Sequence, residues 1–396
     1  MGGRRVSGLG RRDHPLGRGL PWVALAVGVA WTMAIGSYYR GIRSGGDTKD
    51  YLIRVEQVGR QAMSFESLYQ PRYQGAHMTT VWMRWLGPRG FVAATVALTA
   101  LLPWLSDSVL RRSGAGPWAR LGALAFIGAN PELYKWAWFV LSDGLFLIQV
   151  ALLLALLAAA RASALWWVSV AALLYSVVYT RPTGLLVFPG VAAFALASRD
   201  RRVRWGLLAL CAGFGAWVGC WLAAGQVKHA EHADIARRTF VGGHLLQNPH
   251  MGVPLDVPFS EREAKDRSVG ELCGAYPAYC ARYVAAKLGA YFVPVYPKYS
   301  SRHRAFNAVY FGSLSLLSVI GAGWLLRGRG FRRRLSALPP AAWAGGAILL
   351  SAGAFHTLTH VDSDARYLIV WTPVWIISAW LMLDRAMRPA GGGHEA

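Results

Sequence analysis

The first stretch that could do chemistry follows the first long apolar run of the chain. It reads Arg-Gly-Ile-Arg-Ser-Gly-Gly-Asp-Thr-Lys from residue 40, so Asp47 follows two glycines and lies among Arg40, Arg43 and Lys49. A carboxylate can serve as a general base, and neighbouring cations can stabilise charge that develops on a phosphate. We predict a catalytic base at Asp47. Asp is also a favoured N-cap, so a helix that begins at Thr48 is the simpler alternative.

Further ionisable residues stand at the ends of later apolar runs, where we expect a polar chamber between helices. A charge that faces lipid costs about 2 to 3 kcal/mol nearer the bilayer centre, so such residues mostly face a cavity. Each has an alternative role: Asp143 could cap a helix, Arg181 could extend to lipid headgroups, and Arg366 with Tyr367 could be an interfacial anchor. The remaining candidates are Glu66, Arg72, Lys135 and Lys298.

Composition indicates a membrane protein with several helical spans. The 396 residues are 54% hydrophobic, include 18 Trp and carry only 16% charged residues, whereas a soluble protein averages about 25% charged residues. The net charge of +22 would suit nucleic acid. The basic residues instead cluster in short tracts between apolar runs, as in cytoplasmic loops of membrane proteins. We therefore expect membrane lipid around the chain and no nucleic-acid partner.

The apolar runs predict an all-α fold of about ten transmembrane helices. The basic tracts between them place both termini in the cytoplasm by the positive-inside rule. A basic cytoplasmic tail (1–19) precedes a single transmembrane domain (20–386) with outer loops at 39–89 and 225–304, and a second cytoplasmic tail (387–396) follows. The predicted spans are 20–38, 90–106, 118–130, 143–160, 165–180, 183–198, 205–224, 305–326, 338–357 and 367–383.

The two outer loops predict helices that lie at the membrane interface. Apolar residues at helical spacing occur near Leu52 and near Trp82. In the second loop, aromatic residues and one lysine recur at the same spacing, which predicts a helix whose aromatic face rests against lipid or against the bundle. The members of that face are Tyr276, Tyr279, Tyr283, Lys287 and Tyr291.

Cysteine and histidine spacing gives two smaller predictions. Cys273 and Cys280 lie in the second outer loop, where oxidation is permitted, so we expect a local disulfide. His356 and His360 have the spacing of a metal pair on a helix. No acidic motif accompanies them, so we favour a structural role for both.

The order of four short motifs resembles the GT-C class of integral-membrane glycosyltransferases, which includes protein O-mannosyltransferases and aminoarabinose transferases. The motifs are an acidic residue after the first span (Asp47), an Asn-Pro turn at 130–131 before Asp143, Thr-Arg-Pro-Thr-Gly-Leu-Leu at 180–186, and Arg-Tyr-Leu-Ile-Val-Trp-Thr-Pro at 366–373. The similarity extends over most of the chain through short and degenerate motifs.

The resemblance implies a sugar transfer at the extracytoplasmic face, from a polyprenyl-phosphate donor to an envelope glycan, lipid or protein acceptor. It implies that Asp47 is the base and that Asp143 supports the site or an optional divalent metal ion. It also implies that outer-loop cations hold the donor phosphate. A single base with direct displacement would invert the anomeric centre.

Two other classes of membrane protein remain as alternatives. A lipid or small-molecule transporter or flippase would also need many spans and a polar cavity, but it favours mid-span charges and two similar halves. Here most charges lie at the outer ends of the spans, and no internal repeat is visible. A membrane acyltransferase would use His356 or His360 as its base.

Overall fold

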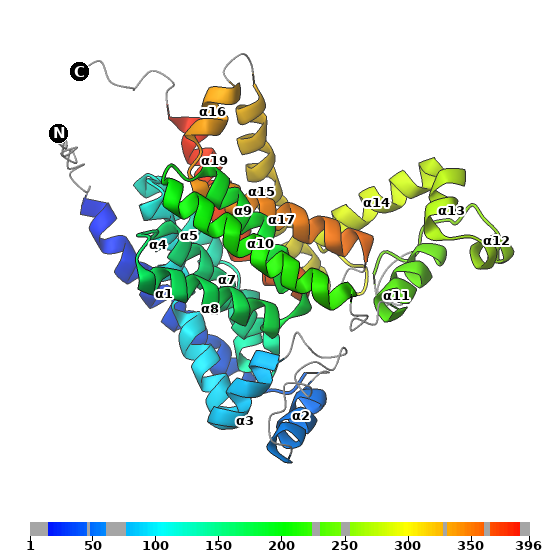
Figure 1. Cartoon of the computed structure of the whole chain (residues 1–396), viewed down its shortest axis with the longest axis horizontal. Coiled ribbons are helices and arrows are strands. Elements are labelled where there is room, and N and C mark those ends of the chain that lie inside the picture. Colours follow the sequence, from blue (N-terminus) through cyan, green and yellow to red (C-terminus); the bar gives the residue numbers. More distant parts are fainter. Residues whose placement is uncertain are drawn as a thin grey trace.

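The computed structural model is a bundle of helices with a smaller helical module at its side (Figure 1). It describes residues 15–45, 48–60, 77–223, 230–246, 254–327, 331–359 and 365–388, and no strand occurs in these ranges. The predicted all-α class is confirmed. The bundle helices are α1 (Pro15–Tyr39), α3 (His77–Ala100), α4 (Leu102–Arg112), α5 (Pro117–Gly128), α7 (Ser142–Ala158), α8 (Ala164–Thr180), α9 (Phe188–Ala197), α10 (Arg201–Ala223), α15 (Ser301–Leu326), α17 (Pro340–Leu358) and α19 (Thr372–Met387).

Shorter elements connect the bundle helices and form the module. They are α2 (Thr48–Arg60), α6 (Glu132–Lys135), η3 (Trp136–Trp138), η4 (Pro182–Val187), α11 (Ala230–Val241), α12 (Glu261–Asp266), α13 (Val269–Ala275), α14 (Pro277–Phe292), α16 (Phe331–Ala337) and α18 (Arg366–Ile369). We call the unit of α11 to α14 the outer module.

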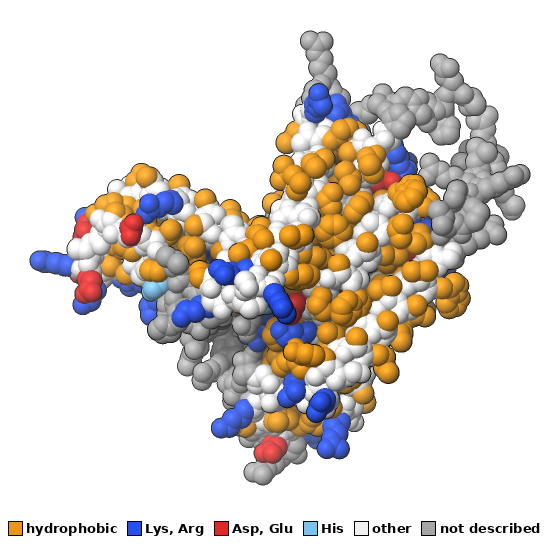
Figure 2. Space-filling model, turned by 180° about the vertical axis from the view of Figure 1, so that it is seen from behind, with side chains coloured by type: hydrophobic (Ala, Val, Ile, Leu, Met, Phe, Trp, Pro, Cys, Tyr) orange, Lys and Arg blue, Asp and Glu red, His pale blue; other side chains and the backbone are white. Residues whose placement is uncertain are grey.

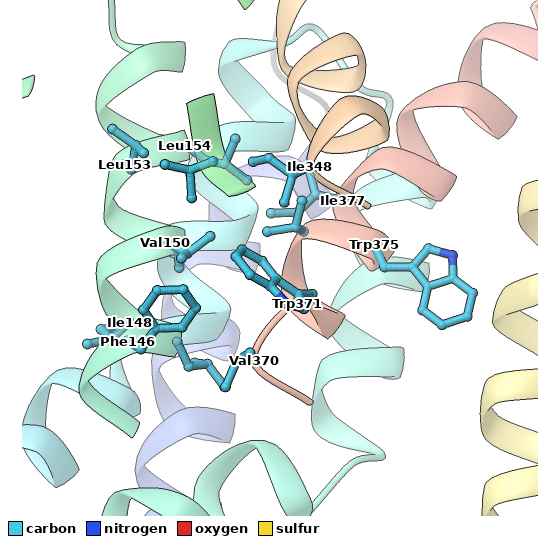
Figure 3. Packing of buried hydrophobic residues seen from close by; sticks show 14 of the residues in the cluster. Phe146, Ile148, Val150, Leu153, Leu154, Ile348, Val370, Trp371, Trp375 and Ile377 are labelled. Carbon is cyan, nitrogen blue, oxygen red and sulfur yellow. The ribbon is translucent and has the colours of Figure 1, made fainter. Parts of the chain in front are cut away.

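The centre of the bundle is packed around Trp371, just before α19. Its ring is fully buried and meets Phe146 of α7 edge-on at 5.1 Å between ring centroids. Ile348 of α17 and Ile377 of α19 lie beside it (Figure 3). In a bilayer, close packing of this kind is a main force that holds helices together, because lipid chains are as apolar as the side chains.

Four stretches of the described chain are long and apolar enough to cross a membrane. Large apolar side chains such as Leu316 and Val319 of α15 are exposed, and Figure 2 shows apolar side chains spread over one face of the bundle. Helices α7 and α8 have 17 residues each, or about 25 Å against a hydrocarbon core of about 30 Å. The four stretches are Gly19–Tyr39, Met78–Arg112, Ser301–Leu326 and Pro340–Leu358.

A kink joins the predicted interfacial helix around Trp82 to the second predicted span. Gly87 has φ of 69° and ψ of 164° inside α3, and Pro88 follows it. Glycine tolerates this conformation and proline cannot donate a backbone hydrogen bond, so the helix changes direction here. The predicted span 90–106 is also divided, since α3 ends at Ala100 and α4 begins at Leu102.

Buried charges fix the turn between α4 and α5, at one end of the bundle. The side chain of Arg120 is buried and donates to both carboxylate oxygens of Asp107, at 2.7 and 2.8 Å. Asp384 of α19 accepts from the backbone N–H of Gly116 at 3.0 Å and pairs with Arg388. The end of α19 therefore holds this turn in place.

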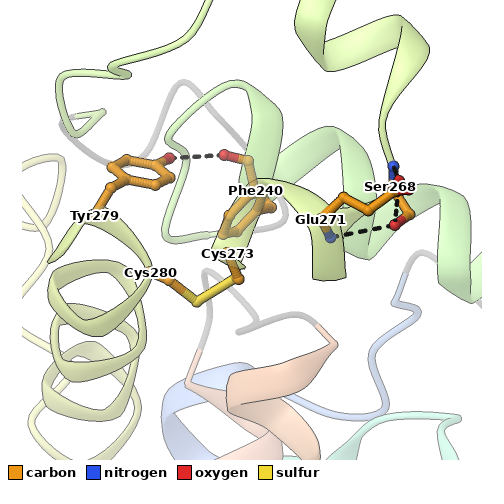
Figure 4. The surroundings of a disulfide bond; sticks show 6 residues. All are labelled: Phe240, Ser268, Glu271, Cys273, Tyr279 and Cys280. Carbon is orange, nitrogen blue, oxygen red and sulfur yellow. Dashed lines mark hydrogen bonds between the residues drawn. A yellow bond between two sulfur atoms is a disulfide. The ribbon is translucent and has the colours of Figure 1, made fainter. Parts of the chain in front are cut away.

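The outer module has a small aromatic core of its own. Phe240 of α11 packs against Tyr279 and Tyr283 of α14, with ring centroids 5.3 and 5.0 Å apart. The predicted disulfide between Cys273 and Cys280 is confirmed and joins α13 to α14 (Figure 4). The aromatic face of α14 is thus covered by protein.

We predict that Gly190→Ala weakens the contact between α9 and α17. A Cβ at Gly190 would lie 2.4 Å from Ile348 and 2.7 Å from the carbonyl oxygen of Ala344. Overpacking of this kind costs about 1 to 3 kcal/mol. The thermal unfolding temperature in detergent should fall.

Gly346→Ala in α17 is the matched control, because nothing lies within 4 Å of its Cβ position. Alanine favours a helix interior over glycine by up to about 1 kcal/mol. Gly346→Ala should leave the unfolding temperature unchanged or raise it, and an equal loss in both variants would contradict the close contact at Gly190.

Candidate functional site

A buried ion pair joins the start of α7 to the end of α8. The guanidinium of Arg181 donates to the carboxylate of Asp143, and their side chains are only 10% and 2% exposed. Arg181 terminates α8 because Pro182 follows it and disfavours a further helical residue. The N-cap of α7 is Leu141, so Asp143 is not the cap of this helix. Arg181 does not extend to the surface.

A column of stacked planar groups covers the ion pair. The guanidinium carbon of Arg181 lies 5.2 Å from the ring centroid of Tyr367. The ring of Tyr367 stacks on His356 at 5.0 Å, and His356 stacks on Tyr291 at 5.1 Å. We call Arg181, Tyr367, His356 and Tyr291 the stacked column. Its residues come from the end of α8 and from helices α18, α17 and α14.

Lys287 of α14 approaches the far end of this column. Its side chain is 1% exposed, and its Nζ donates to the backbone carbonyl of Thr359, the residue after α17, at 3.1 Å. The ammonium also lies 5.1 Å from the ring centroid of Tyr283. Burial lowers the pKa of Lys287 to about 8, because the charged form is poorly solvated there.

The chain after α1 attaches to the residues just before Asp143. The backbone N–H of Arg43 donates to Trp138, and the N–H of Val140 donates back to the carbonyl of Arg43, each at 3.0 Å. Thr48 donates through its hydroxyl to Val140 at 3.0 Å, and the hydroxyl of Tyr51 lies 3.1 Å from that of Ser142. The start of α2 is therefore fixed against the start of α7.

The predicted site residues divide into three groups. Asp143, Arg181, Arg366 and Tyr367 are together, since the guanidinium of Arg366 also lies over the ring of Tyr367, at 5.4 Å. Asp47, Glu66 and Arg72 fall outside the described residues.

The third group stands apart from the ion pair. Lys135 pairs with Glu132 at 2.9 Å and lies over Trp136. Lys298 is exposed between α14 and α15. Neither lysine has a contact with the stacked column among those that the structure shows.

Three residues of this region were not predicted as site residues. Lys287 and Tyr291 were recognised only as the face of an interfacial helix. His356 was considered as a structural residue, as half of a metal pair, or as the base of the acyltransferase alternative. One signal was present: Lys287 is the single charge on an otherwise aromatic face. A charge on a buried face has to meet a polar partner, which sequence spacing does not identify.

The described residues contain no group of three or more His, Cys, Asp or Glu side chains that could hold a metal ion. The resemblance links Asp143 to an optional metal ion, but the carboxylate of Asp143 is paired with the guanidinium of Arg181. His360, the partner of His356 in the metal alternative, is outside the described residues. We derive no chemical step through a metal.

Comparison with protein families, with characterised proteins and with solved structures gave no match to this chain. The resemblance to the GT-C class remains a prediction from short motifs.

We predict that Asp143→Leu destabilises the protein by about 3 to 5 kcal/mol, because it leaves the Arg181 charge buried without its carboxylate. The double variant Asp143→Leu with Arg181→Met should be more stable than the single variant, since it removes both charges. Thermal unfolding of both variants in detergent measures the difference. A double variant that is less stable than Asp143→Leu would show that the two side chains do not act as a pair.

Proposed function

We propose that the chain is a membrane glycosyltransferase, which moves a sugar from a polyprenyl-phosphate donor to an envelope acceptor on the extracytoplasmic face. The observation that carries the proposal is the buried Arg181, held by Asp143 and covered by Tyr367. A guanidinium in a fixed orientation suits the geometry of a phosphate oxygen pair. Arg366 brings a second cation to the same ring.

The proposed reaction is a single displacement at the anomeric carbon. The acceptor oxygen forms a bond to this carbon while the bond to the donor phosphate oxygen breaks, and the phosphate leaves with the electron pair. Arg181 and Arg366 stabilise the charge that grows on the departing phosphate. Asp47 takes the proton of the acceptor hydroxyl. Attack opposite the leaving group inverts the anomeric centre.

The assignment of Asp47 as the base is supported by its neighbours in the chain. Thr48 follows Asp47 directly and binds Val140, three residues before Asp143. Tyr51, one turn further along α2, meets Ser142 next to Asp143. Residues on the C-terminal side of the proposed base are thus fixed to the element that carries the ion pair.

The proposed topology has ten spans, cytoplasmic termini and a site at the outer face. In support, the start of α1 and the ends of α15 and α19 lie at the same end of the bundle (Figure 1). Tyr39, at the opposite end of α1, packs against Phe139 at 5.6 Å, four residues before Asp143. The ion pair therefore lies in a segment that contacts the C-terminal end of α1.

We predict that Asp47→Asn reduces sugar transfer by about 100-fold or more, because loss of general base catalysis costs factors of this size. Purified protein in liposomes, supplied with a polyprenyl-phosphate sugar and a membrane extract as acceptor, gives the rate of glycoside formation. Glu56→Gln is the matched control, since Glu56 is exposed on α2, and it should retain the native rate.

Full activity of Asp47→Asn would reject Asp47 as the base. Movement of the intact lipid-linked sugar between leaflets without any glycoside product would instead favour the flippase alternative.

We predict inversion at the anomeric centre. Nuclear magnetic resonance of the donor and of the isolated product gives the two anomeric configurations directly. Opposite configurations are expected from a single displacement, and identical configurations would require a covalent sugar intermediate that the proposed site does not provide.

A further inference from the structure

Helix α14 of the outer module contacts the candidate site through Lys287 and Tyr291. Lys287 donates to the carbonyl of Thr359 at 3.1 Å. One turn later, the ring of Tyr291 stacks on His356, and its hydroxyl lies 3.5 Å from the carbonyl of Tyr367. The two carbonyls stand on either side of the connection between α17 and α18 in sequence. One face of α14 thus meets the residues that come before and after this connection.

Residues of the stacked column lie in the helices on both sides of this connection. His356 belongs to the last turn of α17, three residues before Thr359. Tyr367 belongs to α18, which starts after Ala365 in the left-handed conformation with φ of 56°. A short helix of four residues has little stability of its own. The position of Tyr367 therefore depends on what it packs against.

Stability alone does not explain a lysine at this place. Its ammonium is buried beside the ring of Tyr283, and burial lowers its pKa because the charged form is poorly solvated there. A methionine of similar length would fill the same space without this cost. What a methionine cannot do is donate to the carbonyl of Thr359.

We propose that Lys287 is a positioning residue, which holds the end of α17 from the outer module and so sets Tyr367 against Arg181. The contacts run from Lys287 to Thr359, through His356 in the same turn of α17, to the ring of Tyr367 and then to the guanidinium. The inference rests on the proposed function, in which Arg181 binds the donor phosphate.

A plainer role for Lys287 is to cap the C-terminal end of α17, where a cation is favourable. Such a cap would affect the stability of the whole protein. It would not make the effect of Lys287 depend on Tyr367. A double-mutant cycle separates the two roles, because residues that act through one another give non-additive effects.

The experiment compares Lys287→Met, Tyr367→Leu and the double variant in full-length protein. Lys287→Met should lower kcat/KM for sugar transfer by about tenfold, the size expected for a hydrogen bond to a charged group. In the Tyr367→Leu background, the same substitution should change kcat/KM by less than about twofold. Lys265→Met is the matched control: Lys265 is exposed on α12 in the same module, and its loss should leave the rate unchanged.

A second measurement does not depend on catalysis. The amides of Leu368 and Ile369 donate to the carbonyl of Ala365 within α18, and their hydrogen exchange reports how firmly this helix is held. Lys287→Met should speed this exchange by about tenfold, while Lys265→Met should not. If the native protein transfers no sugar but the exchange result holds, the proposed function fails and the positioning role stands.

Three outcomes would overturn the proposal. Native rates and native exchange in Lys287→Met would show that the contact positions nothing. Losses that multiply in the double variant would show that Lys287 does not act through Tyr367. Failure of both Lys287→Met and Lys287→Arg to give folded protein would assign Lys287 to folding alone.

Discussion

The arrangement of the site depends on one ion pair between Asp143 and Arg181 in a poorly solvated interior. A carboxylate or a guanidinium alone would be costly there, so each side chain requires the other. Because Asp143 lies in the first turn of α7 and Arg181 follows the last residue of α8, their pairing holds these two helix ends together. The aromatic rings of Phe146 and Tyr367 then cover the guanidinium.

The stacked column links the ion pair to three further helices. Tyr367, His356 and Tyr291 come from three different helices, and their rings lie within 22° of parallel at each step. The column therefore connects α14, α17 and α18 through side-chain contacts. At the other end of the column, Tyr291 belongs to the outer module, which is stabilised by its disulfide and by the packing of Phe240.

Much of the helical layout could be predicted from hydropathy and from helix-breaking residues. The predicted spans near α1, α7, α8, α15 and α17 agree with the observed helices to within a few residues, apart from a longer start of α1 and α15. Gly87 and Pro88 mark the kink of α3, and the location of Cys273 and Cys280 in one predicted outer loop led to the disulfide. Local signals sufficed because each of these features is decided by residues near one another in the chain.

Hydrogen bonds and ion pairs between different helices could not be predicted from the sequence. The sequence did not show that Arg120 pairs with Asp107, or that Lys287 donates to the carbonyl of Thr359. A single sequence shows that a charge lies near the end of an apolar run, but not which opposite charge or carbonyl is near it in space.

The sequence by itself therefore determined the all-α class, most of the long helices and the presence of polar residues at the ends of apolar runs. Only the tertiary structure decided that Asp143 binds Arg181 and that α14 reaches the same site, because burial of a charge is tolerable only where a partner from another helix is within hydrogen-bonding distance.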